Sequence, residues 1–228
     1  FEPPSTMQNA RASFFHNSVG GYHGAKPRRL EQFYKLFLQS KKTELLDILN
    51  VKYVIEEKEG NANAIENPNN LGLAWFAEKL IFEENPDSVY MNLLKYDLRD
   101  TAIIESKNQD IINSSNERRI SQIELLKNKT HKKIYSIESN KPGFVVFSEM
   151  FYPGWKAEIN NKEVKLHKVN FILRGLFVTK GANQIKFYFE PSAIKYGSLF
   201  QIISIVVLAA LIFHSSKKLI LSKNRISS

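Results

Sequence analysis

The feature that most constrains this chain is an uncharged run of 18 residues, Tyr196 to Phe213, close to the C-terminus. As an α-helix the run would span about 27 Å, close to the roughly 30 Å hydrocarbon core of a bilayer. A buried helix in a soluble core is the alternative, but no other segment of the sequence is apolar enough to surround such a helix. The run therefore predicts one transmembrane helix over residues 192–214, with the membrane lipid bilayer as a partner.

Basic residues around this run predict its orientation. Four follow it, at Lys217, Lys218, Lys223 and Arg225, whereas Lys195 alone lies just upstream. Because Lys and Arg are enriched on the cytoplasmic side of membrane helices, we expect residues 215–228 to form a basic cytoplasmic tail. Residues 1–190 are then expected to be extracytoplasmic, at the outer face of the cytoplasmic membrane.

More than half of the overall charge of +9 lies in the last 38 residues. Residues 191–228 hold five of the 32 Lys and Arg residues and none of the 23 Asp and Glu residues, which leaves +4 for residues 1–190. That balance is ordinary for a soluble body, so we expect no nucleic-acid partner. The chain contains no cysteine, which excludes disulfides, thiolate catalysis and cysteine-ligated metal sites.

The first residue, Phe1, is not an initiator, and no basic segment followed by an apolar stretch comes after it. An extracytoplasmic body without its own export signal is simplest to explain as the C-terminal piece of a longer membrane protein. We therefore expect the full-length protein to cross the membrane several times.

Residues 1–119 are expected to form a mixed α/β region. Apolar residues recur with helical spacing after Pro27, a second short helix follows Thr43, and Asn85-Pro86 is typical of a third helix start. Strands are expected over residues 51–56, 73–83 and 101–105, with an Asn-rich loop over residues 60–72 and a polar loop over residues 106–119.

Residues 120–191 have the pattern of short antiparallel strands separated by turns. Asn160-Asn161-Lys162 is expected to form a tight hairpin turn, since asparagine tolerates positive φ, and His131 and His167 are expected to be solvated. Seven strands at this spacing suggest a β-sandwich. The predicted fold class is thus α+β, with an antiparallel β-sandwich module over residues 120–191 followed by the membrane helix.

No nucleotide-binding loop, metalloprotease motif or serine-hydrolase motif is present, and we expect no cofactor and no metal site. The first candidate binding segment is Tyr22 to Arg29, where glycines precede a helix start. Its candidate binding residues are Tyr22, His23, Lys26, Arg28 and Arg29. Cations beside helix N-terminal amides favour an anion. A Gly-rich turn that only packs beneath the helix is the alternative.

The second candidate is Trp155, which follows Tyr152-Pro153-Gly154. An exposed Trp and Tyr around such a turn could stack against a sugar, whereas a buried Trp155 would anchor the β-sandwich. The sequence leaves both readings open.

Five stretches along the chain carry a family resemblance. They are SFFHNSVGGYHGAKPRR (residues 13–29), LLDILNVKYVI (45–55), NPNNLGLAWF (67–76), SEMFYPGWKAEINNKEV (148–164) and LRGLFVTKGANQIKFYFEP (173–191). In this order they resemble the C-terminal region of the bacterial YfhO family of membrane proteins. The chain departs from that pattern at Asn160-Asn161-Lys162 and at Thr179 to Asn183, two expected turns.

The resemblance implies a multi-pass membrane protein similar to glycosyltransferases of the GT-C type, which use polyprenyl-phosphate-sugar donors to glycosylate cell-envelope polymers. The catalytic carboxylate of such enzymes is expected in an early extracytoplasmic loop, so this chain would contribute binding residues and no catalytic residue. The alternative is a non-enzymatic, membrane-tethered β-sandwich that binds envelope glycan or a protein partner.

Overall fold

The computed structural model describes residues 13–14, 16–21, 25–58, 61–107 and 118–226. The chain forms two compact units. The first comprises Phe1–Tyr152 and Lys156–Tyr188, and the second comprises Pro153–Trp155 and Phe189–Ser228.

In the described part of the first unit, the strands are preceded or interrupted by helices α2 (Arg28–Ser40), α3 (Glu44–Asp47) and α4 (Pro86–Lys95). Helix α2 follows Pro27, as expected, and is terminated after Ser40 by Lys41, whose φ of 57° is left-handed. Helix α4 confirms its predicted start, because the Asn85 side chain accepts a hydrogen bond from Asp87 N over 2.8 Å and Pro86 occupies the first turn.

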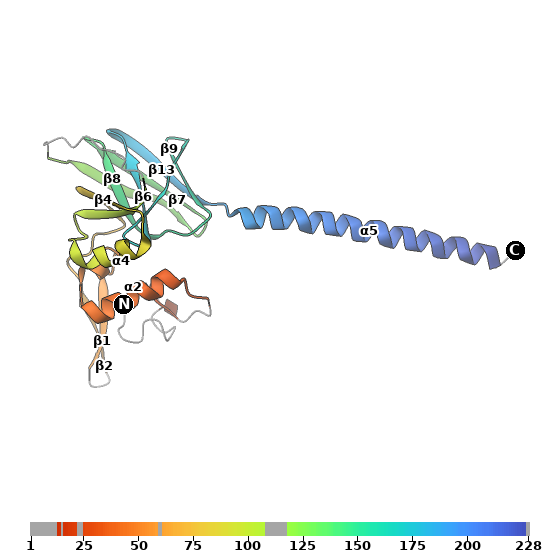
Figure 1. The fold of residues 1–228 in the computed structure, drawn as a ribbon, viewed down its shortest axis with the longest axis horizontal. Helices are drawn as coiled ribbons and strands as arrows, with labels where there is room; N and C mark the ends of the chain where they lie inside the picture. Colours follow the sequence, from red (N-terminus) through yellow and green to blue (C-terminus); the bar gives the residue numbers. More distant parts are fainter. Residues whose placement is uncertain (1–12, 15, 22–24, 59–60, 108–117, 227–228) are drawn as a thin grey trace. The chain divides into compact units, whose positions relative to one another are not determined.

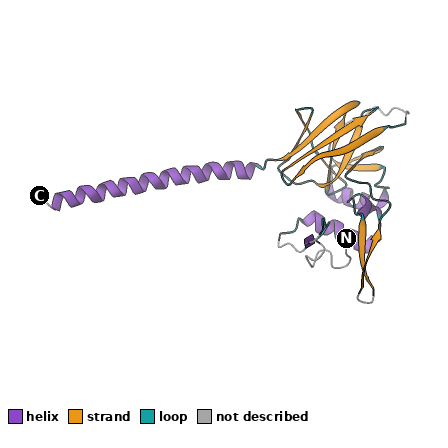
Figure 2. Ribbon diagram, turned by 180° about the vertical axis from the view of Figure 1, so that it is seen from behind, coloured by secondary structure: helices purple, strands orange, loops and turns teal. Residues whose placement is uncertain are grey.

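The strands form two larger sheets and one separate hairpin (Figures 1 and 2). The five-stranded sheet has the order β10 (Lys162–Val164), β9 (Trp155–Ile159), β13 (Gly181–Phe189), β7 (Lys132–Ser139), β6 (Ser121–Lys129). The six-stranded sheet has the order β3 (Ala74–Ala77), β8 (Gly143–Met150), β12 (Leu173–Val178), β11 (His167–Val169), β5 (Thr101–Glu105), β4 (Lys79–Glu83). The hairpin pairs β1 (Tyr53–Lys58) with β2 (Asn61–Glu66). The α+β class is confirmed, with mixed sheets because β4 and β5 run parallel.

Strand β8 has an almost continuously apolar sequence, GFVVFSEM, because side chains on both of its faces are buried. Phe144 and Val146 belong to a core that also contains buried residues of α2 and α4. Phe147, next along the strand and so on the other face, packs its ring on Tyr135 of β7 and Phe187 of β13. Side chains of the six-stranded sheet therefore contact the helices on one face and the five-stranded sheet on the other, which requires apolar residues at both alternations.

The expected strand over residues 73–83 is instead two strands, β3 and β4, which lie at opposite edges of the six-stranded sheet. Only Glu78 separates them, and the amides of Glu78 and Lys79 both donate to the Asp100 carbonyl, over 2.8 and 3.0 Å. The two edges of the sheet must therefore meet at Glu78, so the sheet curls. β3 pairs with β8, and β5 pairs with β11, so strands from before and after residue 120 share this sheet.

Two further expectations are wrong in detail. The loop expected over residues 60–72 includes strand β2, which pairs antiparallel with β1 and is exposed along its whole length, so no alternation of apolar residues marks it in the sequence. His167, expected to be solvated, is 4% exposed in β11. Its ring packs edge-on against Phe144 and Phe177, so the short strand buries it. The predicted Asn160-Asn161 turn is confirmed, with φ of 50° and 65° between β9 and β10.

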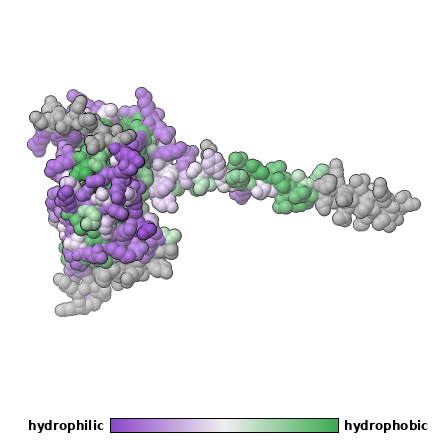
Figure 3. Space-filling view, in the orientation of Figure 1, coloured by the Kyte–Doolittle hydropathy of each residue, from purple (hydrophilic) through white to green (hydrophobic). Residues whose placement is uncertain are grey.

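Helix α5 (Ser192–Ile226) dominates the second unit. Its segment Ser192–Phe213 is long and apolar enough to cross a membrane, and none of its most apolar stretch is buried. Figure 3 shows hydrophobic side chains along this part of the helix. Leu199, Ile203 and Leu211 are all about half exposed or more. An apolar helix whose described side chains are exposed fits a lipid environment better than a soluble core.

Candidate functional site

The first candidate segment leads into helix α2. Tyr22 and His23 lie outside the described residues. Lys26 is half-buried, Arg28 is exposed and Arg29 is half-buried. The amides of Leu30 and Glu31 donate to the Pro27 carbonyl, which closes the first turn. Lys26 also lies close enough to Glu31 to help lower the pKa of that carboxyl, after the larger effects of the Lys35 hydrogen bond and charge. Three cationic residues, Lys26, Arg28 and Arg29, therefore lie close to one another in sequence at the start of a helix, whose first amides lack partners within the helix.

The structure commits Arg29 to an internal ion pair. Its guanidinium donates to both carboxylate oxygens of Glu105, over 2.5 and 3.2 Å, and to the Phe171 carbonyl over 3.2 Å. The guanidinium carbon lies 4.8 Å from the centre of the Phe171 ring. Lys168 adds a second cation, 2.9 Å from Glu105 Oε1. Burial alone would raise the pKa of Glu105, but the hydrogen bonds and charges of Arg29 and Lys168 hold it below its usual value.

Arg29 thereby stabilises an unusual loop between β11 and β12. Asn170 and Phe171 both have left-handed backbone, with φ of 47° and 71°. A bulky residue in this conformation is rare and strained. Phe171 is only 4% exposed and also packs its ring against Tyr90 of α4, at 5.1 Å between ring centres. Arg29 therefore joins the start of α2 to this loop, and its charge is already balanced by Glu105.

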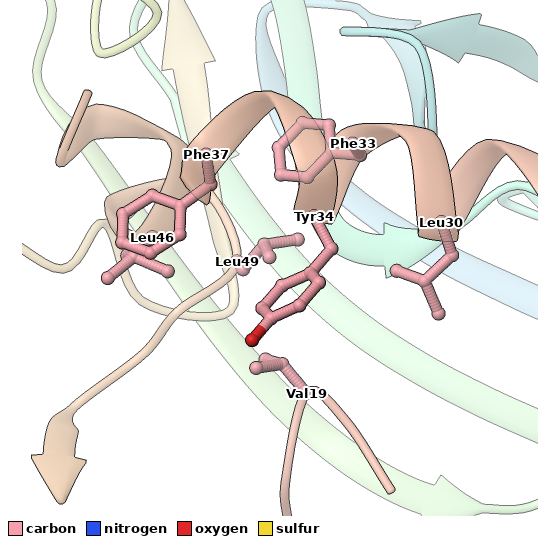
Figure 4. A pocket seen from close by; sticks show the side chains of 7 residues that line it. All are labelled: Val19, Leu30, Phe33, Tyr34, Phe37, Leu46 and Leu49. Atoms are coloured by element: carbon pink, nitrogen blue, oxygen red, sulfur yellow. The ribbon is translucent and has the colours of Figure 1, made fainter. Parts of the chain in front are cut away.

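An apolar pocket lies along α2 beside this helix start (Figure 4). It is lined by Val19, Leu30, Phe33, Tyr34, Phe37, Leu46 and Leu49. Val19 belongs to the Gly-containing segment that precedes the helix, and the Tyr34 side chain points toward it. The lining is hydrocarbon apart from the Tyr34 hydroxyl, and the volume of about 10 Å³ is close to that of one water molecule.

A charged cluster between the two larger sheets was not predicted from the sequence. Glu149 accepts hydrogen bonds from Tyr135 Oη at 2.6 Å and from Arg174, and it lies 2.8 Å from Lys133 Nζ. The Arg174 guanidinium lies 4.4 Å from the centre of the Phe187 ring and is fully buried. Burial raises the pKa of Tyr135, with the charge of Glu149 and their hydrogen bond adding to the effect, so the hydroxyl stays protonated and donates. The sign of this cluster in the sequence is an arginine inside the apolar run FILRGLFV, residues 171–178. An arginine buried with such a run requires an anionic partner.

Two of the family-like stretches contact each other through polar side chains. Asn67 donates from its amide nitrogen to Asp47 Oδ1 and to the Val51 carbonyl, each over 2.9 Å. Asp47 is 1% exposed, and this burial raises its pKa above the usual value despite the hydrogen bond from Asn67. Asp47 and Asn67 therefore have a structural role, in which they join the two stretches. Neither residue is placed in a binding site that is open to solvent.

Trp155 is half-buried at the start of β9. Its ring packs on Phe189 at 5.4 Å between ring centres, with the planes tilted by 50°. It is absent from the buried core of the sheets. Its role as a sugar-stacking platform stays a prediction.

Comparison with known protein families matches residues 88–201 to the family model described as bacterial membrane protein YfhO. This is half of the 228-residue chain. The chain belongs to the YfhO family. Searches of curated proteins and of solved structures each returned no match.

The YfhO match extends from within α4 through strands β5 to β13 into the first turns of α5, and it leaves out β3 and β4. It includes Glu105, Glu149, Trp155 and Arg174, whereas Lys26, Arg28 and Arg29 precede it. Membership of a membrane protein family agrees with the apolar helix over Ser192–Phe213.

Proposed function

We propose that this chain is the extracytoplasmic region and last membrane helix of a multi-pass, glycosyltransferase-like YfhO protein, in which it binds the polyprenyl-phosphate-sugar donor. An envelope glycan would be the acceptor. The supporting observation is the combination of an exposed cation at the start of α2, Arg28, with an apolar pocket along the same helix. A polyprenyl phosphate has the same two parts, an anionic head and a hydrocarbon chain.

The residues divide into two roles in this proposal. Lys26 and Arg28, with Tyr22 and His23, contact the phosphate, and the helix amides add to the attraction for an anion. Arg29 acts indirectly, because its pair with Glu105 fixes the first turn of α2 against the sheet. The first isoprene units lie over the pocket between Val19 and Leu30, which widens to take them in, because its present volume is only about 10 Å³.

Phosphate binding would also assist sugar transfer. The leaving phosphate gains negative charge as the sugar departs, so cations held around it stabilise the transition state more than the ground state. The catalytic carboxylate is expected elsewhere in the full-length protein.

Binding of farnesyl phosphate to the purified chain in detergent tests the head-group contacts. Lys26→Ala and Arg28→Ala are each expected to weaken this binding roughly tenfold, since a hydrogen bond to a charged group is worth about 1.5 kcal/mol or more. The binding of farnesol, which lacks the phosphate, should not change. Lys35→Ala is the matched control, because Lys35 lies on the same helix and pairs with Glu31. Equal weakening by all three substitutions, or no binding of farnesyl phosphate to the unmodified chain, would contradict the proposal.

A further inference from the structure

The second unit contains a contact between two segments that are far apart in sequence. The turn Pro153–Trp155 lies with Phe189–Ser228, the segment that contains the candidate membrane helix. The Glu190 amide donates to the Gly154 carbonyl over 2.7 Å, and the Trp155 ring packs on Phe189. Trp155 is therefore held against the residues that immediately precede the helix.

Gly154 makes this close contact possible. Its φ is +104°, and a Cβ atom placed there would lie 2.9 Å from Pro191 Cβ and 3.0 Å from the Phe189 ring. Side chains larger than hydrogen would therefore push the turn away from Pro191, in addition to straining the backbone. The Pro-Gly-Trp order is explained by this packing, whereas a glycan platform would not require a glycine pressed against Pro191.

The distance to the membrane span follows from chain geometry. Phe189 precedes Ser192, the first residue of the span, by three residues, so the two are at most about 10 Å apart. The span of 22 residues is about 33 Å long as a helix, slightly more than the roughly 30 Å hydrocarbon core. Ser192 therefore lies at the edge of the core, and Trp155 lies in the head-group layer or just outside it.

We propose that Trp155 is an interfacial anchor that contacts the lipid head-group layer at the outer end of α5. Tyr196, 61% exposed in the first turns of the helix, belongs to the same aromatic belt. Trp and Tyr are enriched at this depth because their rings are apolar and their N–H or O–H group reaches polar neighbours. Phe189 and Gly154 fix the indole at that depth.

Depth-dependent fluorescence quenching tests this role, because the chain contains two tryptophans. In the 228-residue chain with Trp75→Phe, reconstituted into phospholipid vesicles, Trp155 is the reporter. Lipids brominated close to the head group should quench it more strongly than lipids brominated near the chain ends. The Trp155→Phe chain is the control, since Trp75 is 8% exposed in β3 and should be quenched by neither lipid.

A glycine substitution tests whether the turn holds the indole in place. In the Trp75→Phe background, Gly154→Ala should reduce quenching by the shallow bromines. Gly181→Ala should not, although Gly181 has a similar φ of +96°, because nothing lies within 4 Å of its added Cβ. If neither brominated lipid quenches Trp155 in the Trp75→Phe chain, the proposal that Trp155 is an interfacial anchor is wrong. A change in emission caused only by soluble oligosaccharide would assign Trp155 to glycan binding instead.

Discussion

Replacing Glu149 with leucine is expected to destabilise the first unit by roughly 3–5 kcal/mol, because Arg174 then loses its carboxylate while it stays buried. For a body of this size the melting temperature should fall by roughly 6–20 °C. Arg174 is 0% exposed, and no rearrangement within the packed sheets would hydrate its guanidinium. Thermal melting of the 228-residue chain in detergent, followed by circular dichroism, measures the effect.

A double substitution separates a buried charge from a simple loss of packing. Glu149→Leu combined with Arg174→Met removes both charges and keeps apolar volume between the sheets; Tyr135→Phe is included in every protein compared, so that no buried hydroxyl loses its acceptor. Buried ion pairs are often replaced by hydrophobic residues at little cost, so the double variant should recover most of the lost stability. A double variant as unstable as Glu149→Leu alone would show that the charges do not matter as a pair.

Asn170→Ala is expected to cost roughly 2–4 kcal/mol. The Asn170 side-chain oxygen accepts a hydrogen bond from the Ile103 backbone amide over 2.8 Å. The Asn170 backbone amide donates to the Ile103 carbonyl over 2.9 Å. Alanine leaves the buried Ile103 amide without this acceptor, at about 1–3 kcal/mol, and it tolerates the left-handed backbone less well than asparagine, at about 1 kcal/mol.

Asn170→Gly is the matched control for this second substitution. Glycine adopts the left-handed backbone readily but also lacks the acceptor, so it should show only the hydrogen-bond part of the loss. Urea unfolding of the three proteins, with free energies compared at equal slopes, gives the two contributions. If glycine restores full stability, the hydrogen bond to Ile103 contributes nothing and the strained backbone explains the whole effect.

Local signals in the sequence were sufficient for much of the fold. The Asn85-Pro86 start of α4 and the Asn160-Asn161 turn each depend on residues that lie next to one another, so their physics can be read from a short window. The apolar helix over Ser192–Phe213 is equally local, because length and composition alone qualify it to cross a bilayer.

Non-local pairing could not be predicted in the same way. The split of residues 73–83 into β3 and β4 depends on partners near residues 101 and 145, and His167 is buried only because Phe144 and Phe177 reach it from other strands. The sequence identified Arg29 as a cation but could not show that Glu105, 76 residues away, neutralises it.

Membrane topology tests the central claim most directly, because the proposed lipid-phosphate binding and the interfacial anchor both require the first unit to be outside. The chain has no cysteine, so single reporters can be introduced at Thr130, which is exposed in the turn between β6 and β7, and at Ser222, after the span. In intact cells, an impermeant maleimide should label Thr130→Cys and leave Ser222→Cys unlabelled until the membrane is permeabilised. Labelling of Ser222→Cys in intact cells, with Thr130→Cys protected, would contradict the account.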